Sequence, residues 1–398
     1  MAKLQKDGQL VRARSALLDR LDWRTVVFAT SVAGAVGFAI AVRLAFGAHI
    51  REDAYITLRY AKHIAAGHGF VFNTGEHVLG TTTPLYALLV AGLAALGLAP
   101  VTAAVAVGII ADAAAMVVLG LLAARFLPRM AVLSALLVYA ALSPIVSWAL
   151  SGMETPLYVL LILSAVLTYA QGRMRLLGLC AALVVLTRPD GAIVVAVILL
   201  HALIRRRRGL LGAALVFAIV MLPWLAFASS YFGSPIPQSM VAKLQRDVSD
   251  PTLSLRNLVW YFSDTENRWF LPLTPLFLFG ILRSKRDRAL VVLIAWAFAY
   301  VAAFVISNRL VFPIIPFEWY FLPLLAPYSI GIGAGMEGIA AAAASVGRTR
   351  RPWLRTAVAI PVAGIFLLGY VGVLRYQHSE LGRLVGVEKR YTVSWLPE

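Results

Sequence analysis

The sequence contains very little cysteine and very little charge for its length. Its 398 residues include a single cysteine, Cys180, so the chain cannot form an intrachain disulfide. Only 14% of its residues are charged and 61% are hydrophobic. Soluble domains carry roughly a quarter of their residues as charges, so this composition indicates a polytopic membrane protein.

Several catalytic signatures are also missing from the sequence. It has no Walker A loop, no dinucleotide-binding glycine fingerprint, no serine nucleophile elbow and no cysteine and histidine pattern with metal-ligand spacing. Chemistry driven by a bound nucleotide is therefore unsupported.

The charges that are present are mostly basic, and the formal net charge is +17. They stand in short runs between apolar stretches, as in the cytoplasmic loops of membrane proteins. The clearest runs are 205–208, 283–288 and 348–355, together with the N-terminal tail. We therefore place these runs in the cytoplasm and expect no nucleic-acid partner.

The apolar stretches predict an all-α polytopic membrane protein with about eleven transmembrane helices. A further apolar stretch, 82–98, decides the topology, because the acids at 52 and 53 reach the outer face only if it does not cross. We predict that it lies at the outer interface. The predicted spans are 24–46, 101–123, 131–150, 155–170, 174–187, 191–204, 210–228, 269–283, 289–307, 321–341 and 356–374.

This topology predicts three parts of the chain. Residues 1–23 form a cytoplasmic basic tail, residues 24–374 form the transmembrane domain, and residues 375–398 form an external tail. Within the domain, residues 47–100 form a first external loop with juxtamembrane helices, and residues 229–268 form a second large external loop.

Polar residues gather in the first external loop, between His49 and Pro84. Its first half predicts a short helix and its glycine-rich second half predicts an irregular loop. The candidate binding residues in it are Tyr55, Arg59, His63, His68, Asn73 and Glu76.

An acidic pair, Glu52 and Asp53, begins this loop helix. Adjacent helical residues point about 100° apart, so the two carboxylates suit different tasks, a general base and an orienting or metal-binding partner. In the alternative interpretation, both acids only stabilise the helix N-terminus through its dipole.

Two later segments carry charge between apolar spans. Glu154 precedes a predicted helix, where it could bind a substrate or simply cap the helix. Arg188 and Asp190 stand at a break between two short spans, a costly place for charge in a membrane protein. Arg188 could bind a phosphate through its planar fork, or the two residues could only neutralise each other.

Other polar positions are less specific. Lys243 follows a proline-rich stretch and could bind phosphate or simply be solvated. Asp112 lies in mid-span and is either functional or protonated and hydrogen-bonded within the bundle. The aromatic residues at 260–261 and 319–320 indicate interface anchors.

The ordered segments resemble the GT-C glycosyltransferases. The most similar branch is that of the bacterial cell wall terminal arabinofuranosyltransferases and their uncharacterised relatives. The resemblance covers residues 24–340 and rests on the segments 52–61, 67–76, 151–157, 186–191 and 231–243, which occur in the same order. Longer members carry a soluble C-terminal domain, so the resemblance is to a short form.

The resemblance implies an integral enzyme of the bacterial cytoplasmic membrane with an external active site. It would move a hexosyl or pentosyl group from a polyprenyl-phosphate donor to a hydroxyl of an envelope glycan, lipid or protein. Inverting displacement would use Glu52 as the base, with Asp53 as the second candidate. A divalent cation (Mg²⁺, Mn²⁺ or Ca²⁺) could bind both acids.

The remaining roles follow from the same resemblance. Arg188, Lys243 and Arg59 would bind the donor phosphate, and Glu154 and Asp190 would join the loop residues in the sugar and acceptor pocket. The other partners would be membrane lipids. Two other functions stay open, a transporter or flippase of lipid-linked sugars and a catalytically silent membrane scaffold.

Overall fold

The computed structural model describes residues 23–244, 270–310 and 318–346. Every regular element in these ranges is helical, as predicted. The elements are α2 (Trp23–Phe46), α3 (Ala54–Ala65), α4 (Pro84–Ala95), α5 (Pro100–Ala123), α6 (Arg129–Ala141), α7 (Ser143–Ala149), α8 (Thr155–Gln171), α9 (Met174–Thr187), η1 (Pro189–Gly191), α10 (Ala192–Ile204), α11 (Leu210–Phe232), α12 (Gln238–Leu244), α14 (Phe270–Arg283), α15 (Arg288–Leu310), α16 (Glu318–Phe321), η2 (Leu322–Leu324) and α17 (Leu325–Val346).

The chain is an integral membrane protein built as a helical bundle. Three described helices, α2, α5 and α11, are long and apolar enough to cross a membrane, and seven shorter described helices are also apolar. The predicted all-α membrane bundle is confirmed. The predicted span 356–374 and most of the loop 229–268 lie outside the described residues.

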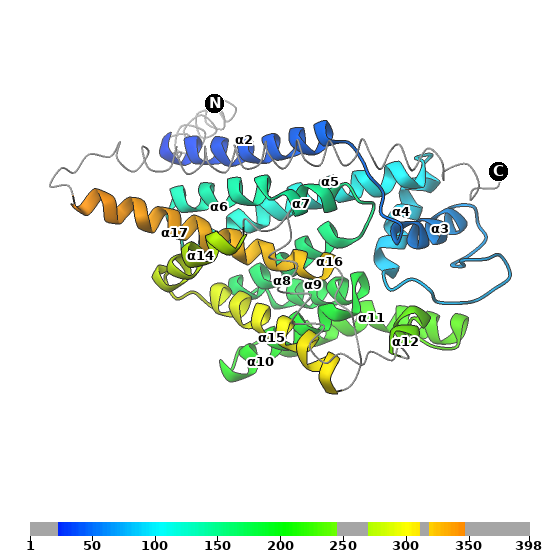
Figure 1. Cartoon of the computed structure of the whole chain (residues 1–398). Coiled ribbons are helices and arrows are strands. Elements are labelled where there is room, and N and C mark those ends of the chain that lie inside the picture. The colour runs from blue at the N-terminus through cyan, green and yellow to red at the C-terminus, as the bar shows by residue number, and fades with distance from the viewer. Residues whose placement is uncertain (1–22, 245–269, 311–317, 347–398) are drawn as a thin grey trace, which may run out of the picture.

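The helices run side by side across the view in Figure 1, and α3, α4 and α12 lie at its right-hand end. Within the bundle, α5 packs on α8, α8 on α9, and α17 on both α6 and α14. Since α4 has only 12 residues and packs on α3, it belongs to this end of the bundle. That 82–98 lies at the outer interface stays a prediction.

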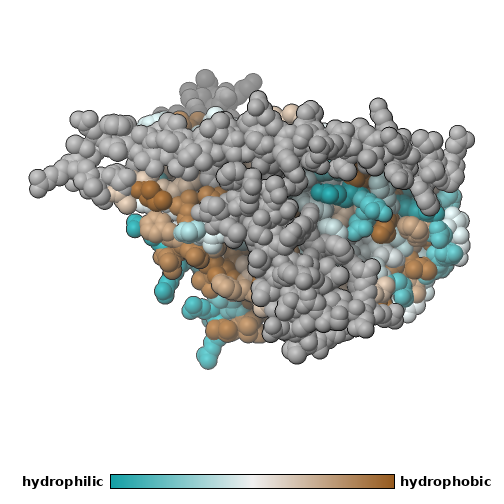
Figure 2. Space-filling model, in the orientation of Figure 1, coloured by the Kyte–Doolittle hydropathy of each residue, from teal (hydrophilic) through white to brown (hydrophobic). Residues whose placement is uncertain are grey.

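Side chains of opposite character gather in different regions of the surface. Figure 2 shows apolar side chains over α14 and α15, and hydrophilic side chains toward the end where α3 lies. Phe298 of α15 is 74% exposed and Leu282 of α14 is 85% exposed, a pattern that suits contact with lipid tails.

One predicted span is divided in two. Residues 131–150 form α6 and α7, which are separated at Leu142. Pro144 is in the first turn of α7, where its missing N–H costs no hydrogen bond, but it cannot continue α6. The predicted span 131–150 therefore consists of two helices.

The basic runs meet at the opposite end of the bundle from α3. Arg125 after α5 forms an ion pair of 3.2 Å with Asp287 before α15. Arg129 at the start of α6 donates a hydrogen bond of 2.9 Å to the Thr25 hydroxyl of α2. Segments that the charge pattern assigns to one side of the membrane are therefore neighbours in space.

Asp112 has a buried partner that the sequence did not indicate. Arg43 of α2 donates from Nε to Asp112 of α5 at 2.9 Å, and the Tyr139 hydroxyl of α6 donates to the other carboxylate oxygen at 3.1 Å. Arg43 also donates to the backbone carbonyls of Ala39 and Ala140. An intramembrane ion pair thus joins three helices. Asp112 is hydrogen-bonded within the bundle, as the alternative had it, but its partner Arg43 favours the charged carboxylate and not the protonated acid of that alternative.

Candidate functional site

A cavity of about 340 Å³ lies at the end of the bundle that carries α3. We call it the site cavity. Most of the segments that line it are helix ends or loops at this end, although they are distant in sequence, and α15 lines it from within the helix. The lining residues are Asp53, Ile56, Thr57, Gly80, Thr81, Thr82, Thr83, Met153, Glu154, Arg188, Pro189, Asp190, Ile193, Ser239, Met240, Ala303, Phe304, Trp319 and Tyr320.

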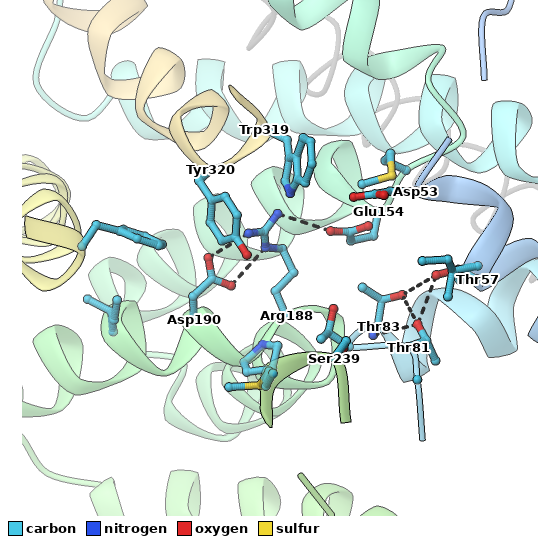
Figure 3. Close-up of a pocket in the computed structure, with 18 of the residues that line it drawn as sticks. Asp53, Thr57, Thr81, Thr83, Glu154, Arg188, Asp190, Ser239, Trp319 and Tyr320 are labelled. Carbon is cyan, nitrogen blue, oxygen red and sulfur yellow. Dashed lines mark hydrogen bonds and ion pairs between the residues drawn. The ribbon is translucent and has the colours of Figure 1, made fainter. Parts of the chain in front are cut away.

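Arg188 is the central cation of the site cavity. It donates from Nε and Nη2 to the two carboxylate oxygens of Asp190, at 3.0 Å and 3.1 Å, and from Nη1 to Glu154 at 3.3 Å. The Tyr300 hydroxyl donates to Asp190 at 2.7 Å. Figure 3 shows Arg188 between the two carboxylates. Arg188 is buried, so this network holds a desolvated guanidinium in one orientation.

The local sequence explains why the chain turns at Arg188. The residue before a proline avoids the helical region, and Arg188, which precedes Pro189, has an extended backbone with φ −153° and ψ 134°. Helix α9 therefore ends at Thr187. At Gly191 a Cβ would collide with Val184, so only glycine lets the chain turn so close to α9.

Glu154 is the buried acid of the site cavity. It occupies the N-cap position of α8, but its side chain makes no capping hydrogen bond and accepts one from Arg188 instead. The alternative in which Glu154 only caps a helix is therefore wrong. Burial raises the pKa of Glu154, the charges of Asp190 and Asp53 raise it further, and the charge of Arg188 opposes this shift.

The first loop reaches this acid through backbone contacts. Arg51 donates its N–H to the Ser151 carbonyl at 3.0 Å, and His49 donates to the Leu150 carbonyl at 3.4 Å. Gly152 has φ +74°, a conformation that favours glycine, and a Cβ there would press on Ile50 at 3.2 Å. These contacts place the start of α3 against the turn that carries Glu154.

The two acids of the first loop differ in their positions. Both are exposed, but Asp53 lines the site cavity next to Glu154, as Figure 3 shows, whereas Glu52 is not among the lining residues. Asp53 is the N-cap residue of α3 and makes no side-chain capping bond. Its carboxylate is thus available to the cavity.

Three threonines form a hydroxyl cluster on another wall of the site cavity. Thr57 lies 3.1 Å from Thr81 and 3.2 Å from Thr83, and Thr81 lies 3.0 Å from Thr83, measured between hydroxyl oxygens. The loop that carries Thr81 and Thr83 is held by Tyr60, whose hydroxyl donates to the Val78 carbonyl and accepts from the Gly80 N–H.

The remaining predicted residues of the first loop do not line the site cavity. Arg59 donates to the Phe72 carbonyl and to the Asn73 side chain, which in turn donates to Glu76. These bonds brace the loop. Tyr55 and His68 are exposed. A ring nitrogen of His63 is hydrogen-bonded to the Val71 carbonyl.

Lys243 belongs to α12, and its side chain lies outside the described part of the chain. Its helix reaches the site cavity through Ser239 and Met240. The Gln238 N–H donates to the Leu79 carbonyl at 2.8 Å, so α12 is attached to the threonine loop.

Aromatic residues at the site cavity were not predicted as part of it. The ring of Tyr320 lies over the Arg188 guanidinium, and Trp319 also lines the cavity, although both were interpreted as interface anchors. Tyr158 and Tyr300 contact Arg188 and Asp190 from α8 and α15. Aromatic residues are common in membrane proteins, both within helices and at their ends, so no local signal distinguished these four.

The charges on the described wall of the site cavity come from one arginine and three acids, Asp53, Glu154 and Asp190. Within the described ranges, no group of three or more histidine, cysteine, aspartate or glutamate side chains is arranged to hold a metal ion.

No protein-family model matches the chain, and no curated protein matches its sequence. Solved structures do resemble it. ArnT from Cupriavidus metallidurans bound to undecaprenyl phosphate has a TM-score of 0.61 and 15% identity, over 88% of this chain and 73% of that chain. The Archaeoglobus fulgidus oligosaccharyltransferase in the apo form has a TM-score of 0.58 and 14% identity, over 88% of this chain and 56% of that chain.

A second structure of the archaeal enzyme also matches. AglB in complex with an inhibitory peptide and a dolichol-phosphate has a TM-score of 0.53 and 12% identity, over 89% of this chain and 56% of that chain. ArnT and AglB are both GT-C glycosyltransferases. The likeness shows that this chain has the GT-C fold.

Proposed function

We propose that this chain, which has the GT-C fold, transfers a sugar from a polyprenyl-phosphate donor to a hydroxyl acceptor. The acceptor would be an envelope glycan, lipid or protein, and the sugar would be a hexose or, as in the arabinofuranosyltransferase branch, a pentose. The solved relatives bound to undecaprenyl phosphate and dolichol-phosphate support a lipid-phosphate donor.

One observation carries the proposal. The buried guanidinium of Arg188 and the accessible carboxylate of Asp53 line one cavity at one end of a membrane bundle. A sugar that leaves a phosphate needs positive charge near the departing oxygens and a base near the attacking hydroxyl. The site cavity offers both kinds of group within a single space.

We assign the base to Asp53 and not to Glu52. Asp53 lines the site cavity, whereas Glu52 is not among the lining residues. A carboxylate base must reach the hydroxyl that it deprotonates. Glu154 is buried and accepts a hydrogen bond from Arg188, so it serves to position that guanidinium.

The donor phosphate needs more positive charge than Arg188 alone supplies. Arg188 already faces Asp190 and Glu154, so a dianionic or monoanionic phosphate would enter a cavity with surplus negative charge. We propose that Lys243 or a divalent cation supplies the additional positive charge. A divalent cation would bind carboxylate oxygens, which suit Mg²⁺, Mn²⁺ and Ca²⁺, and would neutralise phosphate charge.

A second cavity supports a lipid-linked donor. A space of about 250 Å³ between α14, α15 and α17 is lined by apolar side chains, among them Phe277, Leu293 and Phe298. Helix α15 also contributes Ala303 and Phe304 to the site cavity. An isoprenoid chain could thus follow α15 from the phosphate into the membrane.

The transporter alternative has less support. Transporters place their charged sites near the bilayer midplane, at broken helices of paired repeats. Here the site charges lie together at helix ends on one side of the bundle. A scaffold would not need Asp53 and Arg188 to share a cavity, so their shared cavity also favours the enzyme.

A two-part experiment tests the proposal. The purified chain in lipid nanodiscs receives undecaprenyl-phosphate sugars of the hexose and pentose classes, with membrane glycolipids as acceptors, and mass spectrometry follows the release of undecaprenyl phosphate. In parallel, lipid-linked sugars and wall glycans are compared before and after gene deletion. Transfer of one sugar class and accumulation of its donor in the deletion strain are expected. Movement of intact donor across the bilayer, without release of undecaprenyl phosphate, would instead identify a flippase.

A further inference from the structure

We infer that Thr57, Thr81 and Thr83 form a subsite that accepts hydrogen bonds from the hydroxyl groups of a sugar. We call these three residues the threonine ring. This inference rests on the proposed function and specifies which wall of the site cavity contacts the sugar. Figure 3 shows the ring across the cavity from Arg188 and Asp190.

The argument begins with a count of hydroxyl protons. Three hydroxyl groups have three protons, and the ring contains three contacts of hydrogen-bond length between them. A closed ring in which each hydroxyl donates once and accepts once uses all three protons. The backbone N–H of Thr83 also donates to the Thr81 hydroxyl at 3.2 Å, which fills the second acceptor position of Thr81.

The remaining capacity of the ring is therefore that of an acceptor. Thr57 and Thr83 each keep one unused lone pair, and no ring proton is left to donate. Hydroxyls in such chains polarise one another, which strengthens each bond. All three residues are buried yet line the site cavity, so a ligand hydroxyl that donates to them would be shielded from water.

This pattern selects the chemistry of the ligand. An anionic phosphate oxygen can only accept hydrogen bonds, so it would face lone pairs on the ring and would have to break a ring bond. A sugar hydroxyl can donate, and its carbon-bound hydrogens can contact the threonine methyl groups. The phosphate therefore belongs near Arg188, and the hydroxyl-bearing part of the ligand belongs at the threonine ring.

The position of the ring relative to the proposed base supports this orientation. Thr57 follows Asp53 by four residues at the start of α3, and residues four apart on a helix lie on one face. A sugar held by the ring would thus present its neighbouring groups to Asp53. Ser239 adds a further hydroxyl to the cavity wall, and its buried Oγ has no hydrogen-bond partner within the described residues.

The test compares lipids with and without a sugar. Affinities of the full chain in nanodiscs are measured for undecaprenyl phosphate and for undecaprenyl phosphate carrying glucose or arabinose. The variants are Thr57→Val and Thr83→Val, which keep the side-chain shape but lose the hydroxyl. Thr57→Ser and Thr83→Ser keep the hydroxyl, and Thr74→Val changes an exposed threonine of the same loop that does not line the cavity.

We expect each valine variant to bind the sugar-bearing lipid about 2- to 10-fold more weakly, the range for one lost hydrogen bond. Affinity for undecaprenyl phosphate without a sugar should stay unchanged, and the serine variants and Thr74→Val should behave as the parent chain. Equal losses for both kinds of lipid would overturn the inference, and so would no loss for either lipid combined with unchanged binding of a sugar that carries no phosphate. Melting curves of all variants identify any that fail to fold, and Thr57 and Thr83 provide independent tests.

A further arm distinguishes the donor sugar from the acceptor sugar. Binding of methyl glucoside, a sugar without phosphate, is measured by saturation-transfer NMR with undecaprenyl phosphate present. Loss of this binding in the valine variants, with donor affinity intact, would assign the ring to the acceptor and still support a sugar subsite. If the parent chain binds neither lipid, the proposed function is wrong, and a sugar is then not the ligand of the threonine ring.

Discussion

The guanidinium of Arg188 lies over the ring of Tyr320, with 4.5 Å from its central carbon to the ring centroid. Tyr158 is also within cation–π distance, at 5.1 Å. A buried cation next to two aromatic rings and bound to two carboxylates has little freedom to turn. The network therefore fixes the orientation of the Arg188 guanidinium at the site cavity.

Replacing Arg188 by lysine should remove this fixed geometry while keeping the charge. An ammonium group cannot match the planar fork that contacts Asp190 through two nitrogens. We expect Arg188→Lys to lower kcat/KM for sugar transfer by about 100-fold or more, the loss typical when an electrostatic stabiliser of the transition state is removed. Arg173→Lys, at an exposed position between α8 and α9, is the matched control and should retain activity. Parent-level transfer by Arg188→Lys would exclude a role that depends on the fork.

The two adjacent acids of the first loop should differ in mutational effect. Asp53→Asn removes the proposed base and should lower kcat by about 10²- to 10⁴-fold, the range for general base catalysis. Glu52→Gln changes an exposed side chain that does not line the site cavity and should leave the rate within a few-fold of the parent. Rates of undecaprenyl phosphate release measure both variants. A larger loss of transfer rate in Glu52→Gln than in Asp53→Asn would assign the base to Glu52 instead of Asp53.

Removing one partner of the intramembrane ion pair should destabilise the bundle. Asp112→Asn leaves the buried charge of Arg43 without its counter-ion, and such losses typically cost about 3–5 kcal/mol. Removing both charges, in Arg43→Met with Asp112→Leu, should restore much of that stability. Thermal unfolding in nanodiscs measures the three variants. A double variant as unstable as Asp112→Asn would show that this pair contributes more than mutual charge compensation.

The residues that meet at the site cavity could be predicted in part from the cost of charge in a membrane protein. Asp53, Glu154, Arg188 and Asp190 interrupt apolar sequence, and the basic runs that mark the other side of the membrane place all four on one face. The structure brings these four into one cavity. Their placement on one face depends on the prediction that 82–98 does not cross, because one more crossing would reverse the side of Asp53.

Other features could not be predicted because they depend on tertiary packing. Arg43 and Asp112 lie on separate helices, and nothing in either segment identifies the other as its partner. Which of Glu52 and Asp53 faces the cavity is decided by the start of the first turn of α3. Thr57 and Tyr320 have side chains that are common on any membrane helix or interface. Only their neighbours, Thr83 and Arg188, show what they contact.

Close helix packing should make one glycine sensitive to substitution. Gly178 of α9 faces the backbone of α11, and an added Cβ would collide with the carbonyl of Ala213. Gly178→Ala should therefore destabilise the chain by about 1–3 kcal/mol, the usual cost of overpacking. Gly92→Ala in α4 is the control, since no atom lies within 4 Å of the added Cβ, and it should be neutral or slightly stabilising. Thermal unfolding distinguishes the two, and equal midpoints would contradict the tight contact between α9 and α11.

His49 should make the stability of the chain depend on pH. Its Nε2 lies 2.8 Å from the Ser147 hydroxyl of α7, and burial, together with the charge of Arg51, lowers its pKa from 6.5 to about 4. Between these two pH values the unfolded chain binds a proton that the folded chain does not, so acid favours unfolding. The contribution of neutral His49 is complete above about pH 6.5 and is lost progressively as the pH falls toward about 4.

We therefore expect the unfolding midpoint of the parent chain to fall by several degrees between pH 6.5 and pH 4.5, measured by tryptophan fluorescence in nanodiscs. His49→Gln cannot be protonated in this range, so its midpoint should be lower than that of the parent at neutral pH but should change less on acidification. His68→Gln replaces an exposed histidine of the same loop and should keep the pH dependence of the parent. If His49→Gln shows the same fall as the parent, the acid sensitivity has another source. Because His49 also ties the first loop to Leu150 through its backbone, a change confined to its side chain separates titration from the contact that brings Asp53 to Glu154.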